Sequence, residues 1–548
     1  MFSSFTTSLI LCFIVCSSYL FGQSSIPSFI FPLDREPIVT GNYGELRPNH
    51  FHAGIDFRTD QIKNLPIKSV ADGYISRIKI SRGSYGNVLY ITHANGYVTV
   101  YAHQKMFADK IDSYIKQVQI AQQKNEIEVY PEKNVLNVKQ GEVIGFTGNS
   151  GGSTGPHLHF EIRDEKSEIP LNPLLFYNIK DDVKPELNQL AIYNIADTLQ
   201  EQLYSLLPIK NTKGALALSQ PTLTLPFNTI ALGFSGFDMA NGTTNKNNIY
   251  EAKIYLDNTL IYHHQLNHIS FDDARYVNVF SERIKYNKIQ KCFTPSCYQI
   301  SIYKTILQGG KIYLNDTLTH QINLVVADEK GNRNNLNFYI KTKNIQRYTT
   351  NKPLINVTCY KDTLLKKEFV EAEFKAGTFS KPCFIASYIN KLGNVVVGTT
   401  NDQLLKPATI SLKVAQPIIG KESQMVMMLD NRCIGGTYSN GWIKTDTKLL
   451  GAFSISYDTI APKIICKIKN TENLSQHQAL IFKVSDNMSG INDYHLYINN
   501  VWTIAEFDAK TGRMTCKLDD AIRGELQIKL VLSDNVGNVN TLEFKTKR

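Results

Sequence analysis

Residues 155–161 read Gly-Pro-His-Leu-His-Phe-Glu, an alternation of polar and apolar side chains that is typical of a β-strand. The strand period of two points His157 and His159 to one face, about 6–7 Å apart along the backbone. Leu158 then faces the opposite side, into a core. The alternation therefore predicts a sheet with one apolar face and one face that presents two imidazoles. Spacing alone allows both histidines to bind a metal, or one to bind and one to work beside it.

The histidines of this chain cluster near its N-terminus. Six of the twelve lie in the first 160 residues, and four of these six fall into three short signatures. The signatures are His52-Ala-Gly-Ile-Asp56, Tyr101-Ala-His103 and the 155–161 segment. A hydrolytic zinc site needs three ligands from imidazole nitrogen and carboxylate oxygen, plus an open position for water. Further imidazoles can hold that water or stabilise a developing oxyanion, so the cluster indicates a hydrolytic metal site.

The segment around these histidines predicts a small, mostly antiparallel β domain. Residues 67–160 alternate short β-branched and aromatic runs with glycines, a pattern of strands and tight turns. The interruption between His103 and Gln140 differs, because apolar residues recur there at helical spacing. We expect an amphipathic helix that packs on the sheet, with a lid over the site as the alternative. The apolar stripe consists of Phe107, Ile111, Tyr114, Ile115 and Val118.

Together these motifs resemble the lysostaphin-type, LytM-like zinc metalloendopeptidases of peptidoglycan. The resemblance covers roughly residues 41–172. It rests on H-x-x-x-D at 52–56, S-V-A-D-G-Y at 69–74, H-A-N-G-Y-V-T-V-Y-A-H at 93–103 and the glycine-rich run from 141 to 162. The family implies a barrel-sandwich fold built on a duplicated hybrid motif, with one Zn²⁺ in an open groove of the catalytic domain.

The resemblance also implies a role for each matched residue. His52, Asp56 and His159 correspond to the three zinc ligands of the family. His103 and His157 correspond to the two histidines that orient the water and stabilise the tetrahedral intermediate. The family implies peptidoglycan peptide stems as the substrate. A glycine bridge and a direct D-Ala–diaminopimelate cross-link both remain open as the bond that is cut, with a slight preference for the second.

Neighbouring residues of the motifs receive weaker interpretations. His93 lies in the family run without being a ligand there, so we expect a structural role on its strand, and His50 is incidental. The loop 149–155 (NSGGSTG) resembles the wall of the substrate groove, where glycines let a substrate backbone approach. The 104–139 segment departs from the most compact family members, which leaves the shape of the groove open.

Beyond about residue 178 the sequence changes to longer alternating strands with Asn, Asp and Gly turns. Residues 322–338 closely parallel residues 528–544, each reading as a strand, a turn with Asp and Gly-Asn, and a second strand. The segments 182–187 and 458–464 look like matching domain starts, since proline is not accommodated in a central strand. We therefore predict a zinc endopeptidase domain at 24–178, immunoglobulin-like β domains at 179–345 and 458–548, and a β domain of unclear type at 346–457.

The N-terminus predicts export. Ser8 to Phe21 is largely apolar and uncharged, too short for a membrane span of about 20 residues and suited to a signal peptide. We predict a signal at 1–23 and a periplasmic, cell-envelope or extracellular protein, with an uncleaved membrane anchor as the alternative. No other stretch is long and apolar enough to span a bilayer.

The net charge and the cysteine content limit the expected binding partners and disulfide pairs. The net charge of +10 is spread along the chain without a block of Lys or Arg, so nucleic acid is not an expected partner. A diffuse positive charge suits an anionic polymer such as a cell wall, and cell-envelope proteins are further candidate partners. Seven of nine cysteines lie beyond residue 290, an odd number that leaves one thiol free or paired elsewhere. Cys292 with Cys297 and Cys466 with Cys516 are two candidate disulfide pairs, and buried free thiols are an equally good account of these cysteines.

Three functional hypotheses follow. The favoured one is a zinc-dependent endopeptidase that cuts peptide cross-links of peptidoglycan, because every matched ligand and both assisting histidines are present. The second is a non-catalytic LytM-like regulator or scaffold that binds cell wall or activates another wall hydrolase. The third is a wall- or glycan-binding protein that keeps zinc for stability. His263, His264 and His268 are interpreted as surface residues rather than as a second metal site.

Overall fold

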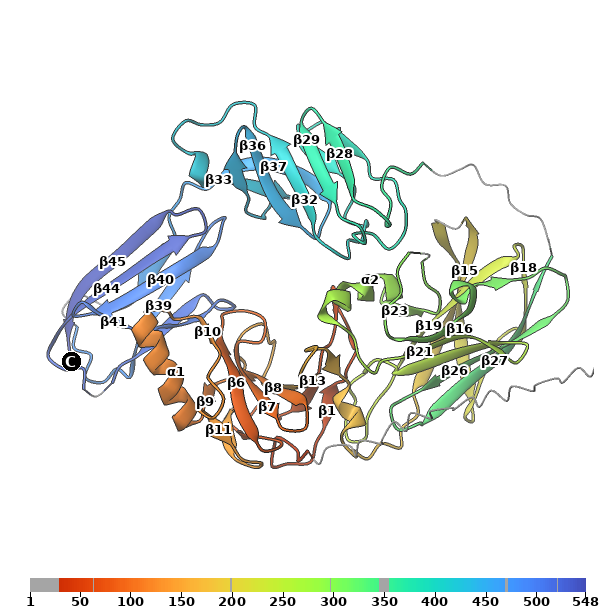
Figure 1. Ribbon diagram of the computed structural model, residues 1–548, viewed down its shortest axis with the longest axis horizontal. Helices are drawn as coiled ribbons and strands as arrows, with labels where there is room; N and C mark the ends of the chain where they lie inside the picture. The colour runs from red at the N-terminus through yellow and green to blue at the C-terminus, as the bar shows by residue number, and fades with distance from the viewer. Residues whose placement is uncertain are drawn as a thin grey trace, which may run out of the picture.

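The computed structural model describes residues 29–62, 64–197, 200–295, 297–343, 354–468, 472–519 and 521–548. The chain is mostly β, as the sequence predicts, and its strands group into four consecutive regions that follow one another around a ring (Figure 1). The predicted signal at 1–23 lies outside the described residues. Within them, no helix is long and apolar enough to cross a membrane.

The first region, residues 29–180, is built on an antiparallel sheet with the strand order β1-β4-β13-β8-β7-β6-β10. Strand β11 pairs with β6, and β14 pairs with β13. These strands are β1 (Val39–Gly41), β4 (Ile55–Arg58), β6 (Gly73–Ile80), β7 (Asn87–His93), β8 (Tyr97–Gln104), β10 (Ile127–Val129), β11 (Asn137–Val138), β13 (His157–Asp164) and β14 (Pro170–Leu171). The core lies on one face of this sheet, where Leu158, Phe160 and Ile162 are fully buried.

Smaller elements complete the first region. They are the hairpin β2 (Leu46–Arg47) and β3 (His50–Phe51), the sheet of β5 (Pro66–Lys68), β12 (Val143–Phe146) and β9 (Met106–Phe107), helix α1 (Asp109–Gln122) and the 3-10 turn η1 (Pro173–Leu175). Within the predicted helical stripe, Ile111 and Ile115 are buried on α1. Phe107 lies before the helix, because its backbone pairs with Gly145 of β12. The helix ends at Gln123, whose left-handed backbone satisfies the last carbonyls.

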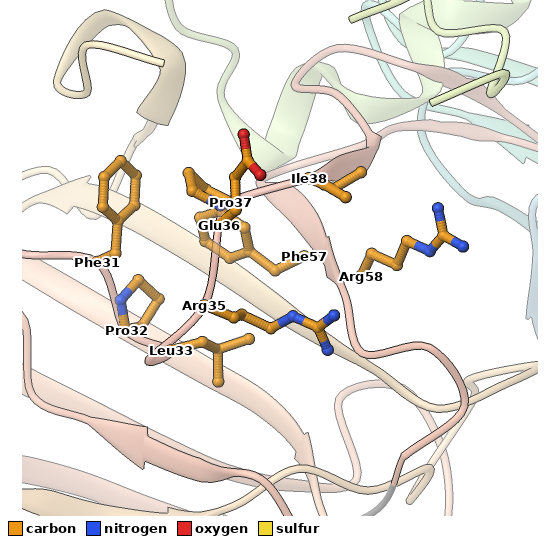
Figure 2. Close-up of a pocket in the computed structure, with 9 residues that line it drawn as sticks. All are labelled: Phe31, Pro32, Leu33, Arg35, Glu36, Pro37, Ile38, Phe57 and Arg58. Atoms are coloured by element: carbon orange, nitrogen blue, oxygen red, sulfur yellow. The ribbon is translucent and has the colours of Figure 1, made fainter. Parts of the chain in front are cut away.

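The N-terminal segment of the described chain lies along this domain. Ile30 N–H donates to Val70 O, and Lys68 N–H donates to Pro32 O. Figure 2 shows the small pocket beneath this segment, with Arg35 and Arg58 extending in the same direction beside it. Both guanidinium groups form ion pairs with Asp60.

The second region, residues 186–342, contains the sheet β22-β23-β19-β15-β16-β17-β27-β26-β20-β21-β24, with β18 beside β27 and β25 beside β19. Its elements are β15 (Glu186–Asp197), β16 (Gln200–Thr212), β17 (Ala215–Leu218), β18 (Thr222–Leu225), β19 (Thr229–Phe237), β20 (Glu251–Leu256), β21 (Thr259–Gln265), η2 (Phe271–Tyr276), α2 (Val277–Phe280), β22 (Ser281–Ile284), β23 (Asn287–Lys291), β24 (Tyr303–Ile306), η3 (Leu307–Gly310), β25 (Ile312–Tyr313), β26 (His320–Ala327) and β27 (Arg333–Thr342). Tyr276 and Phe280 pack into the core of the first region, which joins the two regions.

The third region, residues 363–457, has two sheets, β28-β29-β32-β36-β35 and β30-β31-β37-β33-β34. Its elements are β28 (Thr363–Lys367), β29 (Val370–Phe374), β30 (Ser387–Ile389), β31 (Val395–Val397), β32 (Ala408–Lys413), η4 (Glu422–Gln424), β33 (Met425–Leu429), β34 (Arg432–Cys433), β35 (Thr437–Ser439), β36 (Trp442–Thr447) and β37 (Gly451–Tyr457). A shared core fills the space between the sheets.

The fourth region, residues 463–547, also has two sheets, β38-β39-β43-β42 and β41-β40-β44-β45. Its strands are β38 (Lys463–Cys466), β39 (Ala479–Ser485), β40 (Ile491–Ile498), β41 (Val501–Thr503), β42 (Glu506–Asp508), β43 (Arg513–Lys517), β44 (Glu525–Asp534) and β45 (Val539–Lys547). The two repeated segments form the predicted hairpins, β26 with β27 and β44 with β45. An immunoglobulin-like topology for these regions stays a prediction.

Contacts between the fourth region and the first region close the ring. The fourth region lies beside α1 in Figure 1, where Asn125 Nδ2 donates to Tyr494 O at 2.9 Å and Asn125 Oδ1 accepts from Ala505 N–H at 2.8 Å. The guanidinium of Arg82 donates to Ile491 O and Asn492 O nearby. The C-terminal strands therefore pack against the domain that carries the clustered histidines.

Both cysteine pairings expected from the sequence are wrong. Cys297 forms a disulfide with Cys359 instead, with a Cα–Cα distance of 6.3 Å. Cys292 is a free thiol, and its side chain is buried in the core of the second region, as the alternative of buried free thiols expected. Cys466 and Cys516 are also free. They lie on β38 and β43, and the intervening strand β39 separates them by two strand spacings of about 4.8 Å each, beyond the reach of a disulfide.

A buried histidine in the second region predicts sensitivity to acid. His264 is fully buried, its Nδ1 contacts Tyr262 Oη at 2.9 Å, and burial lowers its pKa to about 3. The unfolded chain protonates the same group near pH 6.5, so the stability that neutral His264 contributes is present above pH 6.5 and lost as the pH falls toward 3. We expect a loss of about 1.4 kcal/mol per pH unit in this window, from this residue alone.

The measurement compares urea midpoints of the wild type and His264→Gln between pH 7 and pH 4. The difference between the two proteins should change steadily across this range, with the wild type losing more stability. His320→Gln is the control of opposite sign, because hydrogen bonds to Asp257 and Asp316 raise the pKa of His320. Its contribution is present below pH 6.5 and is lost as the pH rises. Parallel curves for wild type and His264→Gln would contradict the assignment.

Candidate metal centre and groove

Three neighbouring strands position the clustered histidines. In the antiparallel ladder of β13 and β4, His159 lies opposite Asp56 and His157 opposite Arg58. On its other side β13 pairs with β8, where His159 lies opposite Ala102, next to His103. Because side chains alternate along β13, the two histidines share the face opposite to the core. The strand pairing thus brings residues from three distant segments to one face.

His52, Asp56 and His159 converge on one point. Their ligand atoms all lie within 4.8 Å of one another. His52 Nε2 is 2.9 Å from His159 Nδ1 and 3.2 Å from Asp56 Oδ1, and His159 Nδ1 is 3.0 Å from the same oxygen. All three residues are buried. Two imidazole nitrogens and one carboxylate oxygen therefore face a common centre.

The rings of His52 and His159 are fixed from behind. His52 Nδ1–H donates to the carbonyl of Asn42 at 2.8 Å, which leaves Nε2 with a lone pair toward the centre. His159 Nε2 contacts Glu161 Oε1 at 2.8 Å, which leaves Nδ1 toward the centre. Such outer partners set the tautomer and orientation of a metal-binding imidazole.

His157 and His103 are held in the same way. His157 Nδ1–H donates to Gly155 O and His103 Nδ1–H donates to Ser150 O, each at 2.9 Å. Their ring centroids lie 4.8 Å apart, and that of His103 is 5.9 Å from that of His159. The structure thus gathers the five residues singled out from the sequence into one cluster with four oriented imidazoles.

The backbone at His103 is unusual. Its φ is +59°, in the left-handed region that non-glycine residues seldom occupy, although histidine is among the residues that tolerate it. The irregular pairing between β7 and β8 begins at this end of the strands, and His103 N–H donates to Tyr85 O at 2.9 Å. Strain of this kind persists where surrounding contacts impose it, often at functional sites.

Glu161 and its partners form a second layer that the sequence reasoning did not assign. Glu161 is fully buried, accepts from Tyr85 Oη–H at 2.5 Å and is paired with Arg163 at 2.6 Å. The alternation along β13 puts 157, 159, 161 and 163 on one face, so the pattern that predicted the histidines also contained this signal. Arg163 offsets the buried charge of Glu161, which leaves the carboxylate to orient His159.

The sequence motifs also did not assign Arg47 to this site. Its guanidinium pairs with Asp56 Oδ2, and with Glu45 at 3.1 Å. The other oxygen of Asp56, Oδ1, is the one that faces the imidazoles. Arg47 lies in the short strand β2, and no local pattern linked it to β4. The two carboxylate oxygens of Asp56 therefore have different partners.

Burial and charge set the protonation of the site. Burial alone would raise the pKa of Asp56, but the surrounding imidazoles outweigh it and hold this pKa well below its usual range. Burial lowers the pKa of His159, yet hydrogen bonds to Asp56 and Glu161 raise it to about 9. Burial and neighbouring histidines lower the pKa of His103 to about 3, so this ring is neutral at neutral pH.

The donor set fits zinc. Zinc prefers imidazole nitrogen and carboxylate oxygen in tetrahedral geometry, and bonds of about 2.0–2.1 Å put ligand atoms about 3.3 Å apart. The three contacts among His52, Asp56 and His159 are close to that spacing. The carboxylate is ionised, and the outer hydrogen bonds aim one nitrogen of each histidine inward. Three ligands leave a fourth position, on the side of His103 and His157.

A groove lies beside this centre, and Asp56 and His157 of the cluster are among the residues that line it. One side is formed by Asp56 and Arg58 of β4 and by residues 154–157. The loop 242–245 of the second region also lines the groove. The predicted groove wall, 149–155, packs on the turn at Gly86, since a Cβ at Gly151 would lie 2.3 Å from Gly86 N. Gly151 also has a φ of +67°, so two independent constraints require glycine there.

The fourth region contacts the same loop, residues 149–155. Lys510 Nζ donates to Asn149 O at 2.5 Å and to Ser153 O at 3.0 Å. Residues more than 350 positions apart in sequence therefore meet at the groove. The groove is lined by residues of the first and second regions, and the fourth region contacts the neighbouring loop, which the sequence motifs did not indicate.

The other histidines considered from the sequence are not part of this ligand set. His93 is buried between Asp72 O and Thr99 Oγ1, and His50 is exposed. The groups of metal-ligating residues in the described part of the chain include none of His263, His264 and His268. Of these three, His264 is fully buried, so its interpretation as a surface residue is wrong.

The β-sheet groove and its imidazole–carboxylate triad define a candidate metallohydrolase domain. A model of peptidase family M23 matches residues 50–128 and 108–173, and a Zu5-like domain model matches residues 386–458. Residues 50–173 are therefore a LytM-like peptidase family M23 domain, as the motifs indicated.

Curated relatives match about a quarter of this chain. The DD-carboxypeptidase/endopeptidase Mpg of Neisseria meningitidis serogroup B is 40% identical over 153 residues, 28% of this chain and 29% of that protein. An uncharacterized metalloprotease of Haemophilus influenzae is 32% identical over 152 residues, 28% and 25% of the two chains. The cell division protein DipM of Caulobacter vibrioides is 30% identical over 135 residues, 25% and 18%. The matches span less than a third of the length of these three relatives.

Solved structures also align with about a quarter of the chain. A zinc-containing peptidase from Vibrio cholerae is 26% identical, covering 27% of this chain and 39% of that chain with a TM-score of 0.20. The catalytic domain of lysostaphin from Staphylococcus simulans is 24% identical, covering 25% and 87%, with a TM-score of 0.19.

Proposed function

We propose that this chain is an exported zinc-dependent endopeptidase that hydrolyses peptide cross-links of bacterial peptidoglycan. His52, Asp56 and His159 hold one Zn²⁺, and His103 and His157 assist catalysis. The observation that carries the proposal is the set of four imidazoles around one carboxylate, each with its outer nitrogen anchored so that the inner nitrogen is available. A scaffold or binding protein has no need for two oriented imidazoles beside a complete ligand set.

Bound zinc supplies a Lewis acid and lowers the pKa of a coordinated water enough for attack near neutral pH. The residues of the chain do the rest. His103 is neutral and its Nδ1–H is engaged by Ser150 O, so Nε2 can accept a hydrogen bond from the attacking water. His157 presents Nε2 3.4 Å from Asp56 Oδ1, and because its Nδ1–H is engaged by Gly155 O, it can donate a hydrogen bond from Nε2 to the oxyanion of the scissile carbonyl once the ring has also gained a proton there.

The groove suits an extended peptide rather than a compact ligand. It is open, it is lined by polar side chains and backbone, and its walls come from the loops 154–157 and 242–245. Named relatives of the domain include the peptidoglycan DD-endopeptidases ShyC and ShyB of Vibrio cholerae. These names support cross-linked stem peptides as the substrate class.

The experiment is release of soluble muropeptides from purified, cross-linked peptidoglycan by protein lacking residues 1–23. We expect release with one equivalent of zinc, no release after chelation, and recovery when zinc is restored. Mass spectrometry of the products identifies the bond, because hydrolysis of a glycine bridge and of a D-Ala–diaminopimelate cross-link leave different ends.

The alternative functions predict different results. A protein that binds one zinc tightly and releases nothing from any cross-linked peptidoglycan would overturn the endopeptidase. A regulator would then be recognised by stimulation of a separate wall hydrolase, and a wall-binding protein by zinc-independent sedimentation with peptidoglycan.

A further inference from the structure

Two acidic clusters recur at equivalent places in the second and fourth regions. The first consists of Asp181, Asp238 and Asp328, and the second of Asp458, Asp486 and Asp534. In each cluster one oxygen from every carboxylate lies within 4.8 Å of the other two. One aspartate precedes the first strand of the region, one follows or ends a strand of the sheet, and one begins the turn of the repeated hairpin.

The surroundings of the clusters repeat atom by atom. Asn332 Nδ2 donates to Asp328 Oδ2 at 2.7 Å and to Asp181 O at 2.9 Å. Asn538 Nδ2 donates to Asp534 Oδ2 at 2.7 Å and to Asp458 O at 2.8 Å.

The match continues beyond the clusters. Asn334 Nδ2 donates to Pro185 O, as Asn540 Nδ2 donates to Pro462 O. The structure therefore equates Asp181 with Asp458, one residue earlier than the match between 182–187 and 458–464 that the sequence had indicated.

The first cluster is buried and lacks a compensating charge. Asp238 is 5% exposed, Asp328 is 3% exposed, and Asp238 Oδ1 is a buried oxygen without a hydrogen-bond partner in the described part of the chain. The ion pairs between described residues include none to Asp181, Asp238 or Asp328, and the nearby Lys330 Nζ donates to Tyr177 O instead. Burial and the neighbouring carboxylates raise the pKa of Asp238 to about 8.

The second cluster shows the same deficit at the same position. Asp486 Oδ1, equivalent to Asp238 Oδ1, is also buried and without a partner among the described residues. Asp458 and Asp534 are almost fully buried. A buried carboxylate without a countercharge is costly, and two such clusters with the same orphaned oxygen share a need for a cation.

We propose that each of these two repeats binds a divalent cation, with Ca²⁺ as the preferred ion, through Asp181, Asp238 and Asp328 or through Asp458, Asp486 and Asp534. The ligand sets contain oxygen alone, which favours a hard cation over zinc. Calcium–oxygen distances of about 2.3–2.6 Å put ligand oxygens up to about 5 Å apart, and the clusters meet that limit.

The positions of the sites give the cations a role. Asp181 lies in the connection between the first and second regions, and Asp458 directly follows the last strand of the third region. Asp238 pairs through its backbone with Asn247, which closes the base of the loop that carries 242–245. An ion in the first cluster therefore fixes both a connection between regions and the loop beside the groove. This last consequence rests on the proposed function, whereas the binding of the ions does not.

The test is equilibrium dialysis of the zinc-loaded chain lacking residues 1–23 against Ca²⁺ up to about 10 mM, above the range of weak extracellular sites. We expect two Ca²⁺ per wild-type chain, one in Asp238→Asn, one in Asp486→Asn and none in the double variant. Asp182→Asn is the matched control, because this exposed neighbour pairs with Lys180 and belongs to neither cluster. It should bind two ions.

Thermal unfolding supplies a second readout. Without Ca²⁺ at neutral pH, Asp238→Asn should unfold at a higher temperature than the wild type, because it removes a buried carboxyl that must take up a proton on folding, without changing the shape of the side chain. With Ca²⁺ the order should invert. Fewer than two ions in the wild type, two ions retained by either single variant, or an order that does not invert would overturn the proposal. Retained peptidoglycan hydrolysis without calcium would leave the proposed function intact, so the two failures are distinguishable.

Discussion

Replacing His159 by alanine is expected to abolish zinc binding and peptidoglycan hydrolysis together. His159 supplies one of three inward-facing ligand atoms. Its removal leaves only two ligands, His52 and Asp56, which bind zinc weakly. The loss extends beyond the ligand, because buried Glu161 would lose its contact with the ring. Muropeptide release should fall to background, and zinc content after dialysis should fall from one equivalent toward zero.

Two controls separate metal loss from unfolding. Glu161→Gln keeps the shape of the side chain but removes the charge that orients His159, so zinc affinity should fall by roughly 10–100-fold without being lost. His50→Ala changes an exposed histidine close to the site, and both zinc content and activity should be unchanged. If His159→Ala stays folded and active with full zinc content, the assignment of the metal site is wrong.

The local pattern of side chains was enough to predict much of this site. Alternation of side chains along 155–161 was enough to predict the strand, to place His157 and His159 on one face, and to send Leu158 into the core. The structure bears out this geometry, with Leu158 fully buried and both imidazoles on the opposite face. Strand periodicity succeeds here because both faces of β13 are specified, one by a core and one by polar side chains.

Contacts between distant segments were beyond local pattern. Arg47 pairs with Asp56 through a separate short strand, and Lys510 reaches the groove wall from the last region of the chain. The disulfide between Cys297 and Cys359 likewise joins two regions. Sequence spacing suggested shorter loops for the cysteines, but pairing depends on which side chains face each other across the finished fold.

The repeated hairpins were predicted from the sequence, but the contacts that their turns make were not. The parallel between 322–338 and 528–544 was visible in the sequence, and both segments form hairpins. Their sequence did not reveal that the turn aspartates meet two further carboxylates, because Asp238 and Asp486 directly follow the strands β19 and β39, far from the hairpins in sequence. The three carboxylates of each cluster come together only in the folded sheets. The repeat, which the sequence indicated as a structural feature, therefore also gains a candidate role in binding a cation.

Replacing His103 should separate catalysis from metal binding. Its ring lies close to those of His157 and His159, but its atoms are not part of the converging ligand set. We therefore expect His103→Ala to keep one equivalent of zinc and to lose roughly 10²–10⁴-fold in the rate of muropeptide release. Single-turnover assays at saturating peptidoglycan would place the loss in the chemical step rather than in binding.

The backbone at His103 calls for a second variant. At a φ of +59° alanine is strained by roughly 1–2 kcal/mol, so a loss of activity in His103→Ala alone could reflect a displaced strand end. Asparagine tolerates this conformation, and His103→Asn should retain the thermal stability of the wild type while losing the same activity. Full activity in a zinc-loaded His103→Asn protein would exclude His103 from the chemistry. An inactive His103→Asn protein with zinc bound and the fold intact would show that the ring itself acts on the reaction.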